Sequence, residues 1–195
     1  MNEHNVAKKP IVGFDMDGVI LDNAGSKIKV AKKFGLTIKL SHTPSEILKT
    51  FMPQIVWEEF QNTLYDHPSF AFSTPLMRGV RTVLADLDKK NIPIFLISRR
   101  KVPAIAIKIL EKHSLWPRYF NDKNSHFVDQ PKDKDIKAAK LGITHYIDDE
   151  LKVINVLSRV ENRFLFDPFN VFDKSDQYIK IKSWSEFKKH LFKNV

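Results

Sequence analysis

Short apolar runs alternate with longer amphipathic stretches through most of the chain. The first run, Ile11–Phe14, has the length of a buried strand and leads directly into Asp15. Similar runs predict further strands at 92–97, 127–128, 143–147, 163–166 and 178–181. Apolar residues at helical spacing predict helices at 79–90, 102–113, 134–141, 151–158 and 184–192, the last of them capped by Ser183. This alternation predicts an α/β fold with a doubly wound parallel sheet.

The stretch after the first strand breaks this alternation. Residues 22–76 are rich in aromatic residues and contain no convincing strand. They predict a helix at 24–34, a helix with Thr43 as N-cap and Pro44 in its first turn, a helix from Pro53, and a return loop at 70–75. We therefore expect a small helical cap at 22–76, inserted into a core formed by 1–21 and 77–195. Residues 1–10 are expected to be a short disordered lead.

The composition excludes several kinds of site. The 195-residue chain has no cysteine, which rules out disulfides, thiolate metal sites and a cysteine nucleophile. Its glycines form no glycine-rich phosphate loop, and its histidines lack the spacing of a zinc-binding helix. The first residues lack the apolar core of a signal sequence, and no apolar run reaches the roughly 18 residues of a membrane span. We therefore expect a cytoplasmic protein with no membrane partner.

The net charge of +9 raises the question of a nucleic-acid partner. The basic residues are dispersed along the chain rather than gathered in one tail, and no recognised nucleic-acid motif accompanies them. We expect most of them to lie on solvated faces and a minority to line a phosphate site, so a nucleic-acid partner is not expected.

Polar side chains stand where three of the predicted strands end. Asp15 and Asp17 follow the first strand, Ser98 follows the second, and Asp148 and Asp149 end a later one. Carboxyl ends of parallel strands share one edge of a sheet, where ligands bind. Lys134 begins the helix that leads into the strand ending at Asp148, which places it near the same edge. Each feature alone has an ordinary explanation, such as a turn, a cap or a solvated lysine, but their joint occurrence favours one site.

This set of residues resembles the four motifs of the haloacid dehalogenase-like (HAD) superfamily of phosphotransferases. The first motif stands here as Asp15-Met-Asp17-Gly18-Val19, the second as Ser98, the third as Lys134 and the fourth as Asp148-Asp149. The resemblance implies a HAD-like Rossmannoid core, and the helical segment after the first motif resembles the family's inserted cap.

The resemblance also implies roles for these residues. Asp15 would be the nucleophile that forms an aspartyl-phosphate, and Asp17 would be the acid/base. Mg²⁺ would be held by the Asp15 carboxylate, the Asp17 carbonyl and Asp149, with Asp148 in support. Ser98 would hold the transferring phosphoryl oxygens, and Lys134 would offset their charge. Such roles are physically reasonable, because a cation removes the repulsion between a carboxylate and a phosphate dianion.

An acid/base aspartate at position 17 indicates a phosphatase, since proton transfer to an alkoxide is needed. The segment from Leu165 to Glu186 resembles the tail of the 5'(3')-deoxyribonucleotidase branch, which implies a 5'-nucleotidase acting on (deoxy)nucleoside monophosphates. The residues expected to bind substrate are Gly18, Arg99, Arg78, Trp57 and Phe51. The cationic pair Arg99-Arg100 departs from that branch and favours a more anionic substrate.

Other functions remain open at this point. One alternative is a phosphatase of sugar phosphates or another small phosphometabolite. A second is a basic protein that binds nucleic acid or removes phosphate from strand ends. The resemblance also implies that the chain can pair as a homodimer, through a surface that the sequence does not locate.

Overall fold

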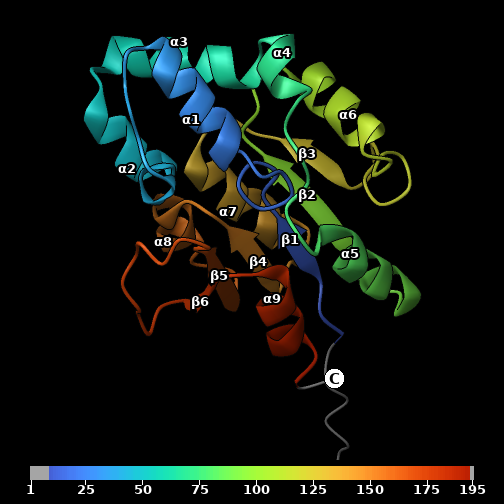
Figure 1. Ribbon diagram of the computed structural model, residues 1–195. Helices are drawn as coiled ribbons and strands as arrows, with labels where there is room; N and C mark the ends of the chain where they lie inside the picture. The colour runs from blue at the N-terminus through green and yellow to red at the C-terminus, as the bar shows by residue number, and fades with distance from the viewer. Residues whose placement is uncertain (1–8, 194–195) are drawn as a thin grey trace, which may run out of the picture.

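A six-stranded sheet, parallel throughout, forms the centre of the computed structural model, which describes residues 9–193 (Figure 1). The strands are β1 (Val12–Phe14), β2 (Ile94–Ser98), β3 (Ser125–Phe127), β4 (His145–Asp148), β5 (Asn162–Phe166) and β6 (Ile179–Ile181). Their order is β3-β2-β1-β4-β5-β6. The predicted fold class is therefore confirmed.

The strand order reverses beside β1. β1 pairs with β2 on one side and with β4 on the other, so the chain builds the sheet outward in both directions from this strand. The register places Phe14 beside both Leu96 and Ile147. In open parallel sheets the crevice at such a reversal, beyond the carboxyl ends of the strands, is where ligands bind. The ends of β1, β2 and β4 all open onto that crevice.

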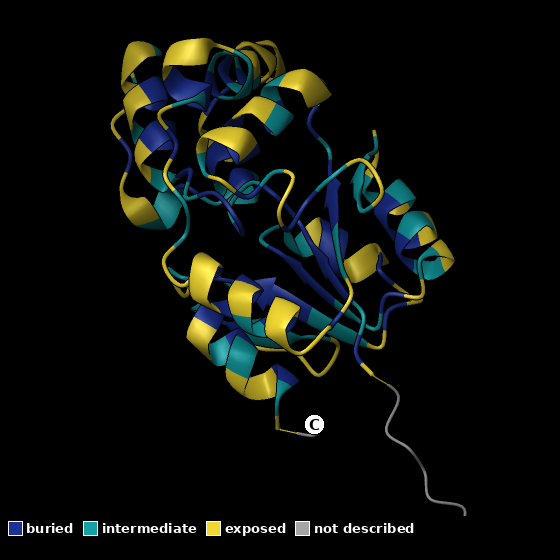
Figure 2. Cartoon of the chain, turned by 90° about the vertical axis from the view of Figure 1, so that its right-hand side faces the viewer, coloured by how far each residue is buried: buried dark blue, intermediate teal, exposed yellow. Residues whose placement is uncertain are grey.

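Five helices cover the two faces of the sheet. They are α5 (Val80–Lys89), α6 (Pro103–Lys112), α7 (Pro131–Lys140), α8 (Leu151–Val156) and α9 (Trp184–Leu191). The apolar sides of α5, α6 and α9 share one core with Phe14 and Leu96, whereas α7 and α8 share the other with Ile97 and Tyr146. Neighbouring residues such as Leu96 and Ile97 belong to opposite cores because side chains alternate along a strand. Figure 2 shows the sheet buried between these layers.

The remaining helices lie together above the carboxyl edge of the sheet (Figure 1). They are α1 (Ala24–Lys33), the 3-10 turn Leu40–His42, α2 (Ser45–Leu48), the 3-10 turn Lys49–Phe51, α3 (Gln54–Tyr65) and α4 (Pro68–Ala71). They bury a core of their own, which includes Val30, Trp57 and Phe60. This is the helical cap expected after the first strand; its boundaries at 22 and 76 stay predictions.

Several element boundaries differ from those predicted. Thr43 does not cap α2, because its hydroxyl donates to the Leu40 carbonyl at 2.7 Å and Pro44 holds the N-cap position. The expected return loop at 70–75 begins within a short helix, α4. α7 starts three residues earlier than predicted because Pro131 suits the first position of a helix.

Two other expectations concern the ends of the chain and membranes. Of the expected disordered lead, residues 1–8 lie outside the described part of the chain. Among residues 9–193, no helix combines the length and the apolar character needed to cross a bilayer.

Candidate active site

The first motif turns sharply where β1 ends. Asp15 follows Phe14 at the edge of the sheet and is 7% exposed. Gly18 then adopts a φ of +82°, which favours glycine. A Cβ atom at Gly18 would lie 2.2 Å from Oδ2 of Asp149. Glycine is therefore required here for two reasons, and the close approach brings the first motif against the end of β4.

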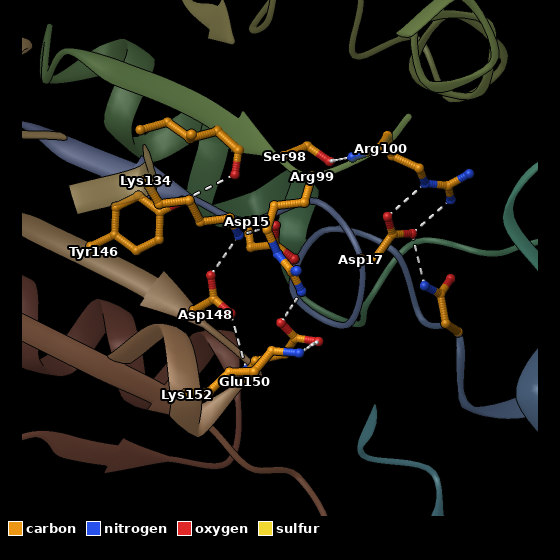
Figure 3. A network of polar contacts seen from close by, with 12 residues as sticks. Asp15, Asp17, Ser98, Arg99, Arg100, Lys134, Tyr146, Asp148, Glu150 and Lys152 are labelled. Carbon is orange, nitrogen blue, oxygen red and sulfur yellow. Dashed lines mark hydrogen bonds and ion pairs between the residues drawn. The ribbon is translucent and has the colours of Figure 1, made fainter. Parts of the chain in front are cut away.

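Lys134 joins two of the buried carboxylates (Figure 3). Its Nζ donates to Oδ1 of Asp15 at 2.6 Å and to Oδ2 of Asp148 at 2.7 Å. The lysine is 1% exposed and lies in the first turn of α7. Although burial alone would lower the pKa of Lys134, the charges of Asp148 and Asp15 raise it well above its usual value. Lys134 is therefore a fixed positive charge beneath Asp15.

Burial raises the pKa of Asp15 to about 7. The Lys134 ammonium opposes this increase, and the neighbouring Asp148 and Asp17 carboxylates add to it. One lysine does not offset the crowding of several acidic groups in a site with little solvent. The arrangement therefore favours binding of a further cation.

Three carboxylates could hold such a cation. One oxygen from each of Asp15, Asp148 and Asp149 lies within 4.8 Å of the others. Both oxygens of Asp148 already accept hydrogen bonds, one from Lys134 and one from the Glu150 amide at 3.0 Å. Asp15 has a second oxygen to offer, and Asp149 accepts no hydrogen bond from the described residues. This donor set fits Mg²⁺, which prefers a few carboxylate oxygens and retained waters, with Asp148 as a supporting group.

Asp17 is held by two side chains. Arg100 donates to Oδ2 through Nε at 2.6 Å and to Oδ1 through Nη2 at 2.7 Å, and Asn23 donates to Oδ1 at 2.8 Å. Burial acts to raise the pKa of Asp17, but the charge and hydrogen bonds of Arg100, together with smaller contributions from Asn23 and Lys27, lower it overall. Asp17 is therefore ionised in this arrangement.

Arg100 also contacts the cap. Its Nη1 donates to the Tyr65 carbonyl at 2.6 Å, and its guanidinium lies 4.7 Å from the centroid of the Tyr65 ring. The preceding turn is fixed by Ser98, whose Oγ accepts from the Arg100 amide at 3.2 Å. One buried arginine thus connects the end of β2, the carboxylate of Asp17 and the end of α3.

A cavity of about 510 Å³ opens between the cap and the core. Its lining is mostly polar and contains Asp15, Asp17, Ser45, Gln61, Asn62, Tyr65, Asp66, Ser98, Arg99, Arg100, Lys101, Asp129, Gln130, Asp149 and Glu150. A volume of this size is typical of a small-molecule site. Both aspartates of the first motif therefore face a space that can accept a substrate.

The residues predicted to act in catalysis or metal binding lie together. Asp15, Asp17, Ser98 and Asp149 line the cavity, and Lys134 and Asp148 lie directly beneath Asp15. Their chemical roles stay predictions.

The residues predicted to bind substrate are scattered. Arg99 lines the cavity and forms an ion pair with Glu150, while Gly18 packs against Asp149. Of the five, Arg99 alone lines this cavity. Trp57 is buried in the cap core and stacks on Phe60, with ring centroids 5.6 Å apart.

Phe51 and Arg78 lie elsewhere on the molecule. Phe51 is 43% exposed and packs against the His42 ring. Arg78 is exposed just before α5. The structure offers Tyr65 as the cap aromatic residue at the cavity, in place of Phe51 and Trp57.

The side chains that hold Asp17 could not be predicted from the sequence. Asn23 and Arg100, which donate to Asp17, belong to no motif, and neither does Tyr65, whose carbonyl accepts from Arg100. The unusual Arg99-Arg100 pair after Ser98 was a signal that this turn is specialised, but the sequence does not show which arginine meets Asp17.

Comparisons with known proteins support the fold. No family model matches this chain, and no curated protein does. Among solved structures, a predicted phosphatase from Clostridium acetobutylicum superposes with a TM-score of 0.61 at 18% identity, covering 94% of this chain and 98% of that chain. A HAD family hydrolase from Deinococcus radiodurans R1, with bound phosphate and sodium, gives 0.60 at 14% identity, covering 95% and 96% respectively. The chain has the HAD-like α/β fold.

A third structure with this fold is described as a beta-phosphoglucomutase, from Thermotoga maritima. Its TM-score is 0.60 at 16% identity, and the match covers 93% of this chain and 99% of that chain. Identities this low establish the HAD-like fold alone.

Proposed function

We propose that this protein is a Mg²⁺-dependent phosphomonoester hydrolase that works through an aspartyl-phosphate on Asp15. The observation that carries the proposal is the placement of Asp15. Lys134 binds one of its oxygens, the crowded carboxylates of Asp148 and Asp149 lie beside it, and it faces a cavity large enough for a small substrate.

The first step transfers the phosphoryl group. A carboxylate oxygen of Asp15 attacks phosphorus, and the bond from phosphorus to the leaving alcohol oxygen breaks. Ser98 and Lys134 stabilise the negative charge on the phosphoryl oxygens. Mg²⁺, held by Asp15, Asp149 and the Asp17 carbonyl, would supply further charge stabilisation.

Asp17 moves the protons in both steps. It gives a proton to the leaving oxygen in the first step. In the second step it accepts a proton from the water that attacks phosphorus, which releases phosphate and restores Asp15. With Arg100 in place, Asp17 has the ionised form needed as a base. Its role as an acid requires the guanidinium to withdraw from the carboxylate.

Two substrate classes follow from the same chemistry. Nucleoside monophosphates are supported by the resemblance of the tail to the nucleotidase branch, with Tyr65 as the ring nearest the cavity. Small polar phosphometabolites, including sugar phosphates, are supported by the cavity lining, where Gln61, Asn62 and Ser45 offer hydrogen bonds and the Tyr65 ring already contacts Arg100.

The test is phosphate release from p-nitrophenyl phosphate, nucleoside monophosphates and sugar phosphates, with Mg²⁺ and with EDTA. We expect phosphate release that depends on Mg²⁺ and is lost in Asp15→Asn. Circular dichroism should show that this variant keeps the wild-type fold. Asp88→Asn is the matched control, because Asp88 is exposed on α5. Wild-type activity in Asp15→Asn would refute the mechanism, and release from sugar phosphates alone would refute the nucleotidase assignment.

A further inference from the structure

Lys27 is a buried cation of the cap. It lies on α1, is 4% exposed, and was not part of the predicted site. Its exposed neighbour on the same helix, Lys29, shows that α1 also carries ordinary surface lysines. Burying an ammonium group is costly unless nearby groups stabilise its charge. The position of Lys27 therefore needs a physical explanation.

The hydrogen-bond partner of Lys27 is a neutral group. Nζ donates to Oγ of Ser45 at 3.1 Å, and no carboxylate of the described residues lies within 4.0 Å of Nζ. The other buried cations at the site differ in this respect, because Arg100 pairs with Asp17 and Lys134 pairs with Asp15. Lys27 thus brings a positive charge to the site without a direct ionic partner.

Ser45, which accepts the hydrogen bond from Lys27, stands at the wall of the catalytic cavity. Ser45, 7% exposed, lines that cavity, whereas Lys27 lines a separate cavity of about 30 Å³, and Asp149 lines both. The Lys27 charge opposes the increase that burial causes in the pKa of Asp149, which shows that its field reaches the site.

The hydroxyl group of Ser45 can donate a hydrogen bond to a bound ligand. The Ser45 oxygen accepts from Lys27, and among the described residues its hydroxyl hydrogen has no acceptor. A hydroxyl that accepts from an ammonium can still donate its own hydrogen. The complement to such a pair is an oxygen that bears negative charge, because charge-assisted hydrogen bonds are the stronger ones.

We propose that Lys27 and Ser45 form a cap-borne subsite for a second anionic oxygen group of the substrate, distinct from the phosphoryl group that Asp15 attacks. The proposal rests on the proposed phosphatase function and deepens it. It favours phosphorylated carboxylates or bisphosphates over nucleoside monophosphates, which have no second anionic group.

The test compares ligands that differ in one anionic group. The two pairs are 3-phosphoglycerate with glycerol 3-phosphate, and fructose 1,6-bisphosphate with fructose 6-phosphate. Dissociation constants are measured by calorimetry with Mg²⁺, in an Asp15→Asn background that does not consume the ligands. Preference in the first pair identifies a carboxylate, and preference in the second identifies a second phosphate. We expect about tenfold tighter binding of the charged member of at least one pair.

Substitutions then locate the preference. The quantity compared is the ratio of the two dissociation constants within the preferred pair. Lys27→Met should reduce this ratio to about one, Lys27→Arg should retain part of the preference, and Ser45→Ala should lower it. Lys29→Met, the matched control, should leave it unchanged. Should Lys27→Met fail to fold, Lys27→Gln and Ser45→Ala carry the test.

The outcomes separate this inference from the proposed function. The proposed subsite would be overturned if the Asp15→Asn protein showed no preference, or if the preference were unchanged by Lys27→Met. A higher Mg²⁺ requirement with an unchanged ratio would show that Lys27 only balances the carboxylates. Hydrolysis of p-nitrophenyl phosphate by the wild type reports the proposed function separately, so either idea can fail without the other.

Discussion

At the residue scale, the chemistry depends on how each buried carboxylate is paired. Asp15 meets Lys134 and two further carboxylates, and its pKa is raised to about 7. Asp17 meets the fork of Arg100, and its pKa is lowered. Two aspartates separated by one residue are thus driven in opposite directions by their neighbours, which suits a nucleophile and an acid/base with different tasks.

Replacement of Arg100 tests the second pairing. Arg100→Met removes the contributions that lower the pKa of Asp17 most, while burial still raises it. If Asp17 must carry a proton in the first step, the basic limb of the pH profile of kcat/KM should move to higher pH by about one to two units. The profile is measured with an alkyl phosphate, whose poor leaving group needs the proton.

A neighbouring residue provides the control for this change. Arg99 lies in the same turn but pairs with Glu150, so Arg99→Met should leave the limb in place. A limb that does not move in Arg100→Met would show that the group titrating there is not Asp17 in contact with Arg100.

At the scale of elements, α9 supports the first motif from beneath. Nε1 of Trp184 donates to the Val19 carbonyl at 2.9 Å, and its ring packs on Phe14 with centroids 5.2 Å apart. The start of the helix is fixed by Ser183, whose Oγ accepts from the Glu186 amide at 3.2 Å. A distant helix therefore holds the turn that carries Asp15 and Asp17.

Loss of the N-cap hydrogen bond of α9 should affect stability rather than catalysis. Ser183→Ala removes an N-cap hydrogen bond worth about 1 kcal/mol. For a chain of this size, that corresponds to a decrease in Tm of roughly 2–4 °C. Thermal unfolding measures the loss, and Ser183→Thr, which keeps the hydroxyl, should restore most of it. If the Tm of Ser183→Ala equalled that of the wild type, Ser183 would not stabilise α9 as its N-cap.

At the scale of the whole molecule, the candidate active site lowers the free energy of unfolding, and a bound cation would reduce this loss. Asp15 is buried by the sheet, α7 and the first motif, and it lies near the carboxylates of Asp148 and Asp17. Because its folded pKa of about 7 lies above its ordinary value of 3.8, the folded state retains the proton over a range where the unfolded chain has lost it. Asp15 therefore lowers the free energy of unfolding progressively as pH rises through that range.

Comparison of two proteins isolates this contribution. The Tm of metal-free Asp15→Asn minus that of the wild type should grow as pH is raised from about 4 to about 7. Contributions from histidines cancel in this difference. Mg²⁺ should raise the wild-type Tm more near pH 7.5 than near pH 5, because protons compete with the cation for the carboxylates. A difference in Tm that is independent of pH would show that Asp15 is not destabilised by burial.

The fold class and the set of motif residues can be predicted from the sequence alone. Alternating strands and helices indicate a parallel sheet, and that sheet must bring its strand ends to one edge. Asp15, Ser98 and Asp148 could therefore be grouped before any contact was known. These inferences succeed because hydrophobic periodicity and strand direction are local properties that one sequence displays.

Which side chains meet across the cavity depends on tertiary packing. The rings of Phe51 and Trp57 carry the same local signal as that of Tyr65, yet Tyr65 alone of the three lines the cavity. Likewise, Arg100 rather than Arg99 binds Asp17, and Lys27 is buried whereas Lys29 is exposed. Such choices depend on how the cap packs over the sheet, and packing between elements distant in sequence is not encoded by any local pattern.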